Sequence, residues 1–514
     1  MQTEKDKIRF DKKLILNLIL FCVFVAYLVF NGILLSRHEP WRDEANVWLM
    51  ARELSPIELF AEIRYQGHPC LWYLIVMPFA KAGLPFWSIG LISYFIMAVT
   101  AGIYLFKAPV HPAVKGLSLF CPAFSYFYAD IARNYCLIAL ILILLAVCYP
   151  KRNEKSFCYG LLLGLLVQAD TIAMAAAGMI SLMWLCENLG KSIREKSPAA
   201  LRRILKGIWI PPASLFLWIA QFYRVSDSAA FQMRFPGIRE FLREMGNYSL
   251  WILERLTGRG EGFCSILLFL FLFLFLAVSV RIRNPWAAFV MISAYLFEAV
   301  FSVMVYQLHI WHFIAICFVL IWALWVLAFQ RQEKGPADRV GAGMILGIQM
   351  LFLTLCIGMF MQWNSEEETS NLDNALHGLY SDGRGAAEYM EQNIGREELV
   401  FSSNVSMAST VLAWLPGHRW FYFAGSGERA SYADYNEEQE QQITVEELLC
   451  LVRTKFGDRD VFYLLDSGGS CITDGENLAK YEVLYRTREK TARGEEYTIY
   501  RIPVSGENRK DGVN

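Results

Sequence analysis

Residues 36–73 read SRHEPWRDEANVWLMARELSPIELFAEIRYQGHPCLWY, a charged stretch between two apolar runs. The apolar run before it, residues 14–35, is long enough to cross the hydrocarbon core of a bilayer. The Arg-Asp-Glu cluster at residues 42–44 therefore emerges within about two helical turns of a membrane surface. We expect two short helices lying on the membrane here, one from Asp43 and one after Ser55, because Ser55-Pro56-Ile57-Glu58 is typical of a capping box.

The composition is that of a polytopic membrane protein. The 514 residues are 55% hydrophobic, 15% aromatic and only 19% charged, which is too apolar for a soluble enzyme of this length. The net charge is -1, and nothing in the composition indicates a nucleic-acid partner. Most of the cysteines are single residues inside apolar runs, so they predict neither a disulfide framework nor a metal site.

Apolar runs recur through the first two thirds of the chain and predict a polytopic α-helical membrane protein with about 11–12 transmembrane helices. The segments suitable for crossing are residues 14–35, 87–106, 114–128, 135–149, 157–169, 171–186, 207–222, 263–280, 286–306, 310–329 and 341–361. The shorter run 70–80 spans roughly half of the hydrocarbon, so we predict a re-entrant or tilted helix there, with a full crossing as the alternative.

Lysine and arginine in short loops predict the orientation, because the cytoplasmic side retains them. By this rule the N-terminus is cytoplasmic, whereas the charged stretch and the C-terminal region face outward. The loop 224–261 disagrees, since it is assigned to the outside yet carries several arginines. It contains no lysine, so we keep the assignment and expect an interfacial helix around Arg239 and Arg243.

After residue 362 the pattern becomes that of a soluble α/β domain. Helical patterns cover residues 385–392 and 445–453, and strand patterns cover residues 399–402, 420–423, 460–465, 482–485 and 497–502. We therefore predict a transmembrane catalytic module at residues 1–362, with its first outer loop at 36–70, and an extracytoplasmic α/β domain at residues 363–514.

The first candidate site is the acidic pair Asp43 and Glu44. On a helix the two side chains point about 100° apart and cannot share one proton, but one of them can serve as a base. The structural alternative makes Asp43 an N-cap and Glu44 a favourable first-turn charge, which is the commoner fate of such a pair. A functional role is favoured by the cationic groups of the same stretch, among them Arg64 and His68.

A second candidate site is YADIARNY at residues 128–135, between two predicted crossings. Asp130 and Arg133 are three residues apart. We slightly favour the structural hypothesis, in which the two side chains form only a salt bridge at a helix end. The functional reading is that Arg133 binds a lipid phosphate, because its planar fork matches two phosphate oxygens.

Further candidates lie in or beside the later crossings. His309 and His312 share a predicted helical face; without a third ligand they are a weak metal signal, and they are more plausible as donors to a phosphate. Glu298 and Asp170 lie inside or at the end of crossings, where acids are rare and are functional candidates by default.

Three motifs, in this order, resemble the polytopic GT-C glycosyltransferases of the protein O-mannosyltransferase and aminoarabinose-transferase type, which are similar to glycosyltransferase family 39. They are RDEA at residues 42–45, GHPCLWYL at 67–74 and ARNYCLIALILILL at 132–145. The resemblance covers residues 14–190 best. It extends more loosely to QLHIWHF at 307–313 and to the outward C-terminal domain. This chain departs from the family pattern at Cys70, which replaces the second proline of His-Pro-Pro, and at Gln66, where related sequences often place an acid.

The resemblance implies an inverting transferase of the cell envelope that moves a hexosyl or pentosyl group from a polyprenyl-phosphate sugar. The acceptor would be an extracytoplasmic glycan, lipid or protein. No cofactor is implied with certainty, and a divalent metal is compatible with the sequence but not indicated by it. In that superfamily the acidic residue of the first outer loop is taken as the catalytic base, which implies Asp43 here, with Glu44 beside it. From the chemistry of their side chains we predict that Arg133, His309, His312 and Arg64 bind the donor phosphate and that His68, Asp130 and Tyr135 bind the substrate.

Two other classes of protein remain as alternatives. A polytopic transporter or lipid-linked-glycan flippase would use Glu298, Asp170 and the arginines to line a path, but such folds are built from two similar halves and this sequence shows no duplication. A surface assembly or sensor protein would use the membrane part only as an anchor, and about eleven crossings are excessive for that purpose.

Overall fold

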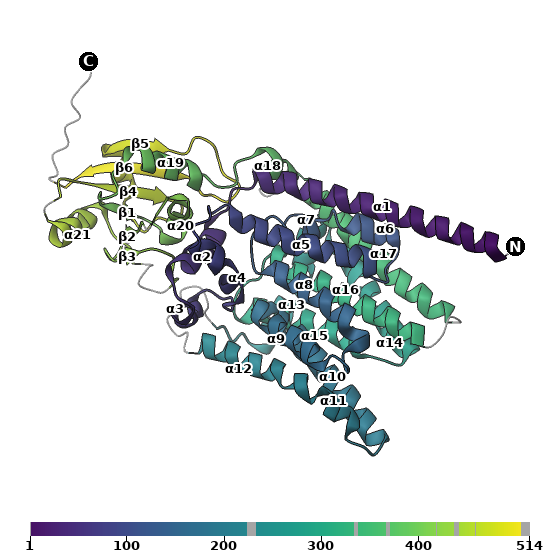
Figure 1. The fold of residues 1–514 in the computed structure, drawn as a ribbon. Coiled ribbons are helices and arrows are strands. Elements are labelled where there is room, and N and C mark those ends of the chain that lie inside the picture. The colour runs from purple at the N-terminus through teal and green to yellow at the C-terminus, as the bar shows by residue number, and fades with distance from the viewer. Residues whose placement is uncertain are drawn as a thin grey trace. The chain divides into compact units, whose positions relative to one another are not determined.

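The computed structural model describes residues 2–223, 233–333, 338–365, 371–417, 419–435, 441–457 and 459–504. These residues form two compact units. Figure 1 shows the chain coloured by residue number from the N-terminus to the C-terminus. The first unit comprises residues 1–36, 92–223 and 232–365, and the second comprises mainly residues 37–91 and 366–514. The charged stretch of the sequence therefore belongs to the same compact unit as the C-terminal region. The predicted boundary at residue 362 stays a prediction.

The first unit is helical. Its helices are α1 (Gln2–Arg37), α5 (Ser88–Lys107), α6 (Pro112–Ser118), α7 (Pro122–Ser125), α8 (Tyr135–Cys148), α9 (Ser156–Ala169), α10 (Met174–Arg194), α11 (Ala199–Ile208), α12 (Ile210–Phe222), α13 (Ile238–Thr257), α14 (Glu261–Ile282), α15 (Trp286–Met304), α16 (Ile310–Glu333) and α17 (Arg339–Trp363). Short 3-10 turns, η2 (Tyr149–Lys151) and η3 (Thr171–Ala173), follow α8 and precede α10.

Within the described residues, 8 helices are long and apolar enough to cross a bilayer, so the chain is a multi-pass membrane protein. They are Lys13–Arg37, Ser88–Lys107, Thr171–Arg194, Ala199–Phe222, Glu261–Ile282, Trp286–Met304, Ile310–Gln332 and Arg339–Trp363. The predicted count of about 11–12 was therefore higher than the number of helices that can span by length alone.

Three predicted crossings account for the difference. The prediction for residues 114–128 was wrong, because Cys121 is extended and Pro122 starts a new helix, so α6 and α7 have only 7 and 4 residues. Helices α8 and α9 have 14 residues each, and a helix of that length reaches only about 21 Å. Helix α4 (Leu71–Lys81), with 11 residues, is likewise too short for a full crossing by itself.

Helix α16 lies at the centre of the first unit. It is apolar on all sides, as expected of a helix without a solvated face, and Phe313 to Val326 are almost entirely buried. The backbones of α9 and α11 are in direct contact at Gly160 and Gly207. A Cβ atom added at Gly160 would overlap the carbonyl of Gly207, and a Cβ atom added at Gly207 would overlap the carbonyl of Ser156. Small residues at a crossing are the usual route to such close packing in membranes.

The segment around Arg239 and Arg243 is helical, as predicted, and forms α13, whereas its position at the membrane interface stays a prediction. Its first part exposes apolar side chains such as Ile238 and Leu242, whereas Ile252 and Leu256 are buried. The helix ends at Gly258, whose left-handed conformation (φ 61°) is typical of a helix C-terminus. The preceding part of that loop, residues 224–232, lies outside the described residues.

The C-terminal part of the second unit is the α/β domain that the sequence predicts. Its sheet has the strand order β3-β2-β1-β4-β6-β5, with β1 parallel to both β2 and β4 and the other pairs antiparallel. The strands are β1 (Val400–Ser402), β2 (Phe421–Phe423), β3 (Arg429–Ala430), β4 (Val461–Ser467), β5 (Glu482–Arg486) and β6 (Tyr497–Pro503). The helices are α18 (Leu372–His377), α19 (Gly383–Asn393), α20 (Val405–Trp414), α21 (Val445–Phe456) and the 3-10 turn η5 (Gly475–Lys480).

All five predicted strands and both predicted helices of this domain are confirmed. The sequence did not indicate α20, because its residues are mostly apolar and Val405 and Ala408 to Ala413 are buried, which leaves no amphipathic period to detect. Asn404 caps α20, since its side chain accepts a hydrogen bond from the backbone N–H of Met407 at 3.1 Å.

The remaining elements of the second unit are α2 (Arg42–Glu53), α3 (Pro56–Glu62), η1 (Ile63–Tyr65) and α4. The predicted capping box is confirmed, because Ser55 N–H donates to the Glu58 carboxylate at 2.8 Å and Glu58 N–H donates to Ser55 Oγ at 3.3 Å. Helix α2 begins at Arg42, one residue before the predicted start. It does not lie free on a surface, since it packs against α20 and α4 and Ala45 to Ala51 are buried.

Candidate active site

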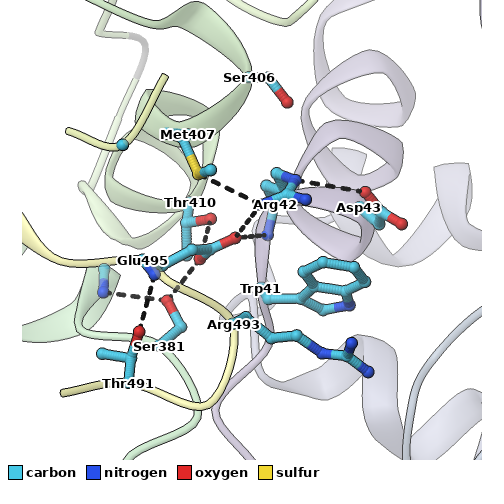
Figure 2. A network of polar contacts seen from close by, with 12 residues as sticks. Trp41, Arg42, Asp43, Ser381, Ser406, Met407, Thr410, Thr491, Arg493 and Glu495 are labelled. Carbon is cyan, nitrogen blue, oxygen red and sulfur yellow. Dashed lines mark hydrogen bonds and ion pairs between the residues drawn. The ribbon is translucent and has the colours of Figure 1, made fainter. Parts of the chain in front are cut away.

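Candidate residues gather at two places, one in each unit. The first is the N-terminal turn of α2, at the centre of Figure 2. Asp43 is the second residue of the helix, and its side chain is 25% exposed. The Nε atom of Arg42 lies 3.9 Å from Asp43 Oδ1, which makes a loose ion pair. A carboxylate in this position can meet a solute while its backbone belongs to a buried helix.

Glu44 differs from its neighbour because its carboxylate is fully buried. One oxygen, Oε2, accepts hydrogen bonds from the backbone N–H of Trp41 at 3.0 Å and from the Nε2 atom of His38 at 2.9 Å. Glu44 therefore closes the first turn of α2 by accepting from the backbone N–H of the N-cap residue, which is one half of a capping box. The N-cap position belongs to Trp41, so the structural alternative that made Asp43 the N-cap was wrong.

A buried glutamate from the C-terminal domain completes this turn. Glu495 Oε1 accepts a 2.9 Å hydrogen bond from the backbone N–H of Arg42, and the guanidinium of Arg42 lies 3.8 Å away (Figure 2). The other oxygen, Oε2, accepts from Ser381 Oγ at 2.6 Å and from Thr410 Oγ1 at 3.0 Å. Burial raises the pKa of Glu495 above its ordinary value, and the hydrogen bonds from Ser381 and Arg42 partly counter this rise.

A second attachment holds α2 one turn further on. The side-chain amide of Asn46 bonds both backbone groups of Ala433, at 2.7 Å from the N–H and 3.0 Å from the carbonyl oxygen. Gln66 Nε2 donates to the same carbonyl at 3.0 Å, and Gln66 Oε1 accepts from Asn46 at 2.8 Å. A carboxylate could not donate to that carbonyl. The hydrogen bond therefore explains why this chain has glutamine at position 66, where the resemblance leads us to expect an acid.

Aromatic and cationic side chains surround the start of α2. Trp41 lies beneath two guanidinium groups, with the Cζ atoms of Arg42 and Arg493 at 4.9 and 4.7 Å from its ring centroid. Arg493 also donates to the hydroxyl of Tyr380 at 2.6 Å, and Tyr380 packs 4.8 Å from the ring of His38. This arrangement fixes the chain on the N-terminal side of Asp43.

Glu39 is the other perturbed acid of this region. Burial is the main cause that raises its pKa to about 7, and repulsion from Asp382 acts in the same direction. A backbone hydrogen bond from Ser381 and the charges of His38 and Arg384 lower the pKa by less. No sequence pattern indicated this residue, because its environment is built by a segment more than three hundred residues away in the chain.

Arg64 and His68 lie in the same unit, beyond α3. The guanidinium of Arg64 packs 4.7 Å from the ring centroid of Tyr65, and His68 is partly buried just before Cys70, the N-cap of α4. Both residues therefore follow the helix that carries Asp43, as the sequence predicts, and their binding roles stay predictions.

The second cluster lies in the first unit, around the turn before α8. Residues 126–134 are a turn, so the expected helix through Asp130 and Arg133 begins only at Tyr135. Asp130 is fully buried, whereas Arg133 is partly exposed. The guanidinium of Arg133 packs over the ring of Tyr135 at 5.4 Å, and Tyr135 meets the ring of His312 edge to face at 5.5 Å. The structure thus brings together three of the predicted residues.

His309 and His312 stack with their ring centroids 6.2 Å apart, at the start of α16. The backbone N–H of His309 donates to Nδ1 of His312 at 3.0 Å. Since Nδ1 is an acceptor, a neutral His312 carries its proton on Nε2, which is then a donor. Within the described ranges no group of three or more His, Cys, Asp or Glu could hold a metal ion.

The two intramembrane acids are both buried. Asp170 accepts from the backbone N–H of Ile172 at 2.9 Å and from Asn134 Nδ2 at 2.5 Å, so it caps η3 and holds the turn next to Arg133. Glu298 is buried in α15, and its Oε2 atom has no hydrogen-bond partner among the described residues. An apolar cavity of about 310 Å³ lies between α13, α14, α15 and α16 and is lined by residues such as Leu267, Phe275 and Phe313.

The helical membrane unit and the mixed sheet with its covering helices define a polytopic protein with the GT-C fold. Two solved structures of ArnT from Cupriavidus metallidurans share this fold with the chain. The structure bound to undecaprenyl phosphate is 11% identical, with a TM-score of 0.52, and the alignment covers 96% of this chain and 98% of that one. The apo structure is 13% identical, with a TM-score of 0.54 and the same coverage.

Comparisons of sequence alone add nothing to this likeness, because no protein-family model and no curated protein matches the chain. The resemblance to GT-C glycosyltransferases that the motifs indicated is therefore confirmed at the level of the fold. Glu495, Asn46 and Tyr380 were missed by sequence reasoning, since they lie outside every motif and acquire their neighbours only through folding.

Proposed function

We propose that this chain is an inverting glycosyltransferase that moves a sugar from a polyprenyl phosphate to an extracytoplasmic acceptor, with Asp43 as general base. The observation that carries the proposal is the fold, which the chain shares over 96% of its length with a protein crystallised with undecaprenyl phosphate. The partly exposed carboxylate at the start of the buried helix α2 supports the choice of base.

The reaction is a single displacement at the anomeric carbon. Asp43 takes the proton of an acceptor hydroxyl, and the acceptor oxygen forms a bond to the anomeric carbon. The bond from that carbon to the phosphate oxygen breaks, and the polyprenyl phosphate leaves with the electron pair. Phosphate is a competent leaving group, so the reaction needs cations near the departing oxygens more than it needs a general acid.

Side chains in each unit are candidates for binding the donor. Arg133, with its guanidinium supported by Tyr135, presents a planar fork for phosphate oxygens, and His312 offers its Nε2–H as a neutral donor. We also propose a role in binding the donor phosphate for His309 and for Arg64, and a role in binding the sugar or acceptor for His68, Asp130 and Tyr135. The apolar cavity between α13 and α16 suits an isoprenoid tail.

The orientation follows the charge of the loops. We propose that the N-terminus is cytoplasmic and that Asp43 and the α/β domain face outward. We further propose that residues 1–362 act as the membrane module and residues 363–514 as the outer domain. This places the acceptor outside the cytoplasm, where a flipped lipid-linked sugar is available.

Mass spectrometry of envelope glycans and lipids tests the function in cells. We expect a strain without this gene to lose one sugar modification, wild-type protein to restore it, and the Asp43→Asn variant to fail although it is present at the wild-type level. Asp373→Asn, which changes an 81% exposed side chain of α18, is the matched control and should restore the modification.

Two results would contradict the proposal. Full restoration by Asp43→Asn would remove the general base, and unchanged glycans in the strain without the gene would remove the transferase activity. Accumulation of a lipid-linked sugar on one side of vesicles that contain no acceptor would instead support the transporter or flippase alternative.

A further inference from the structure

We propose that Glu495 is a positioning residue that holds the first turn of α2 in place and thereby orients Asp43. The inference rests on the proposed function, since a base must be aimed at its proton. Glu495 lies near the end of the chain, in the segment between β5 and β6, and 453 residues separate it from Arg42. No motif of the sequence contains it.

The start of α2 needs an acceptor from elsewhere. The first N–H groups of a helix have no partner within the helix, and side-chain oxygens of an N-cap residue usually satisfy one of them. Here the N-cap is Trp41, whose side chain has no oxygen and caps nothing. Glu495 Oε1 supplies the acceptor for the N–H of Arg42, directly before Asp43, and its negative charge is favourable at a helix N-terminus.

Glu495 is held in one orientation by its own partners. Oε2 is bonded by the hydroxyls of Ser381 and Thr410, and the hydroxyl of Tyr497 lies 3.4 Å away. The backbone N–H of Glu495 donates to Thr491 Oγ1 at 2.7 Å. Because one oxygen faces α2 and the other faces the domain, the carboxylate connects the two without freedom to rotate.

The guanidinium of Arg42 connects the same carboxylate to the base. Its Nη1 atom lies 3.8 Å from Glu495 Oε1 and its Nε atom lies 3.9 Å from Asp43 Oδ1, so Arg42 stands between the two acids in Figure 2. Loss of the Glu495 charge would release Arg42 toward Asp43. In Glu495→Gln the amide oxygen can still accept from the N–H of Arg42, but that hydrogen bond loses its charge and weakens. The change would reach Asp43 in two ways, through the weaker bond to the backbone of the turn and through the ion pair.

Contacts that do not involve Glu495 also hold helix α2 in the unit. The bonds of Asn46 to Ala433 and the burial of Trp48 to Ala51 against α20 and α4 remain in a Glu495 variant. We therefore expect the first turn to loosen while the rest of the helix stays ordered.

The experiment compares Glu495→Gln with wild type and with Glu482→Gln, which changes a 60% exposed glutamate of β5. Glycosyl transfer is followed with the lipid-linked donor extracted from the strain without the gene, and hydrogen exchange is followed in a peptide that covers residues 41–48. We expect kcat of Glu495→Gln to fall on the order of 10–100-fold, since a small displacement of a catalytic group costs that much. The KM for the donor should change little, exchange should rise only in the peptide, and Glu482→Gln should behave as wild type.

Unchanged kcat and unchanged exchange in Glu495→Gln would overturn the proposal, as would a fall in melting temperature with exchange raised over the whole domain. If Glu495→Gln does not fold, Glu495→Asp decides, because a carboxylate one methylene shorter cannot reach both Arg42 and Ser381; full activity of that variant would overturn the proposal. Failure of the proposed function appears separately, as undiminished transfer by Asp43→Asn.

Discussion

The backbone N–H of Arg42 donates a 2.9 Å hydrogen bond to the buried carboxylate of Glu495, 453 residues further along the chain. This contact makes the helix that carries Asp43 part of the C-terminal α/β unit. The sugar-transfer chemistry that we propose would therefore depend on a domain that contributes no motif of its own.

Gln66→Glu should destabilise the attachment of α2. The amide of Gln66 donates to the carbonyl oxygen of Ala433, and a carboxylate would place its charge against that oxygen instead. The carbonyl oxygen keeps its hydrogen bond from Asn46, but the carboxylate oxygen that faces it would have no donor. A buried polar group left unsatisfied costs about 1–3 kcal/mol, so the melting temperature should fall. Gln441→Glu, at an exposed position of the same unit, is the control. Equal melting temperatures of the two variants, measured in detergent, would contradict the role of the amide.

Arg133→Lys should weaken donor binding while leaving the fold intact. Lysine keeps the positive charge but loses the planar fork and its packing over Tyr135, so the KM for the lipid-linked donor should rise about tenfold, with a smaller change in kcat. Steady-state kinetics at several donor concentrations measure this change. The exposed Arg202→Lys in α11 is the matched control, and an unaltered KM in Arg133→Lys would exclude Arg133 from the phosphate site.

Glu39 should make the stability of the protein depend on pH in a defined direction. Its pKa is raised to about 7 from its ordinary value of 4.5, so between these values the folded state binds more protons than the unfolded state. Stability contributed by this group is therefore present at acidic pH and is lost as the pH rises toward 7.

Melting temperatures between pH 5 and pH 8 measure this dependence. Glu39→Gln should flatten the decline over that range, whereas Glu388→Gln, at a side chain 59% exposed, should leave it unchanged. An identical slope in Glu39→Gln and wild type would show that another group is responsible.

Gly207→Leu should disrupt the first unit. A side chain at Gly207 would overlap the carbonyl of Ser156 and press on Trp184, so α9 and α11 would have to separate. Overpacking of this kind costs about 1–3 kcal/mol or more. Gly178→Leu in α10 meets nothing within 4 Å and is the control. The yield and thermal stability of purified protein should fall for the first variant only; equal behaviour would mean that the helices can move apart at no cost.

Hydropathy and local sequence patterns were enough to predict much of the fold. Apolar runs predict helices from their own composition, and the Ser55–Glu58 capping box and the strands of the α/β domain follow from patterns within a few residues. The errors have local causes as well. Pro122 divides one apolar run into two short helices, and the hydropathy of the run alone does not show this break. Helix α20 is buried along most of its length, so its sequence has no amphipathic period.

The candidate site was predicted only in part. The sequence by itself determined a membrane protein with an acidic pair after its first crossing and with arginine and histidine near later ones, because charge and hydropathy are properties of single residues and their neighbours. Only the tertiary structure decided that Glu44 closes a helix turn while Asp43 stays accessible, and that Glu495, Asn46 and Gln66 hold that helix. Burial and hydrogen-bond partners depend on which distant segments pack together, and no local pattern in the chain encodes that choice.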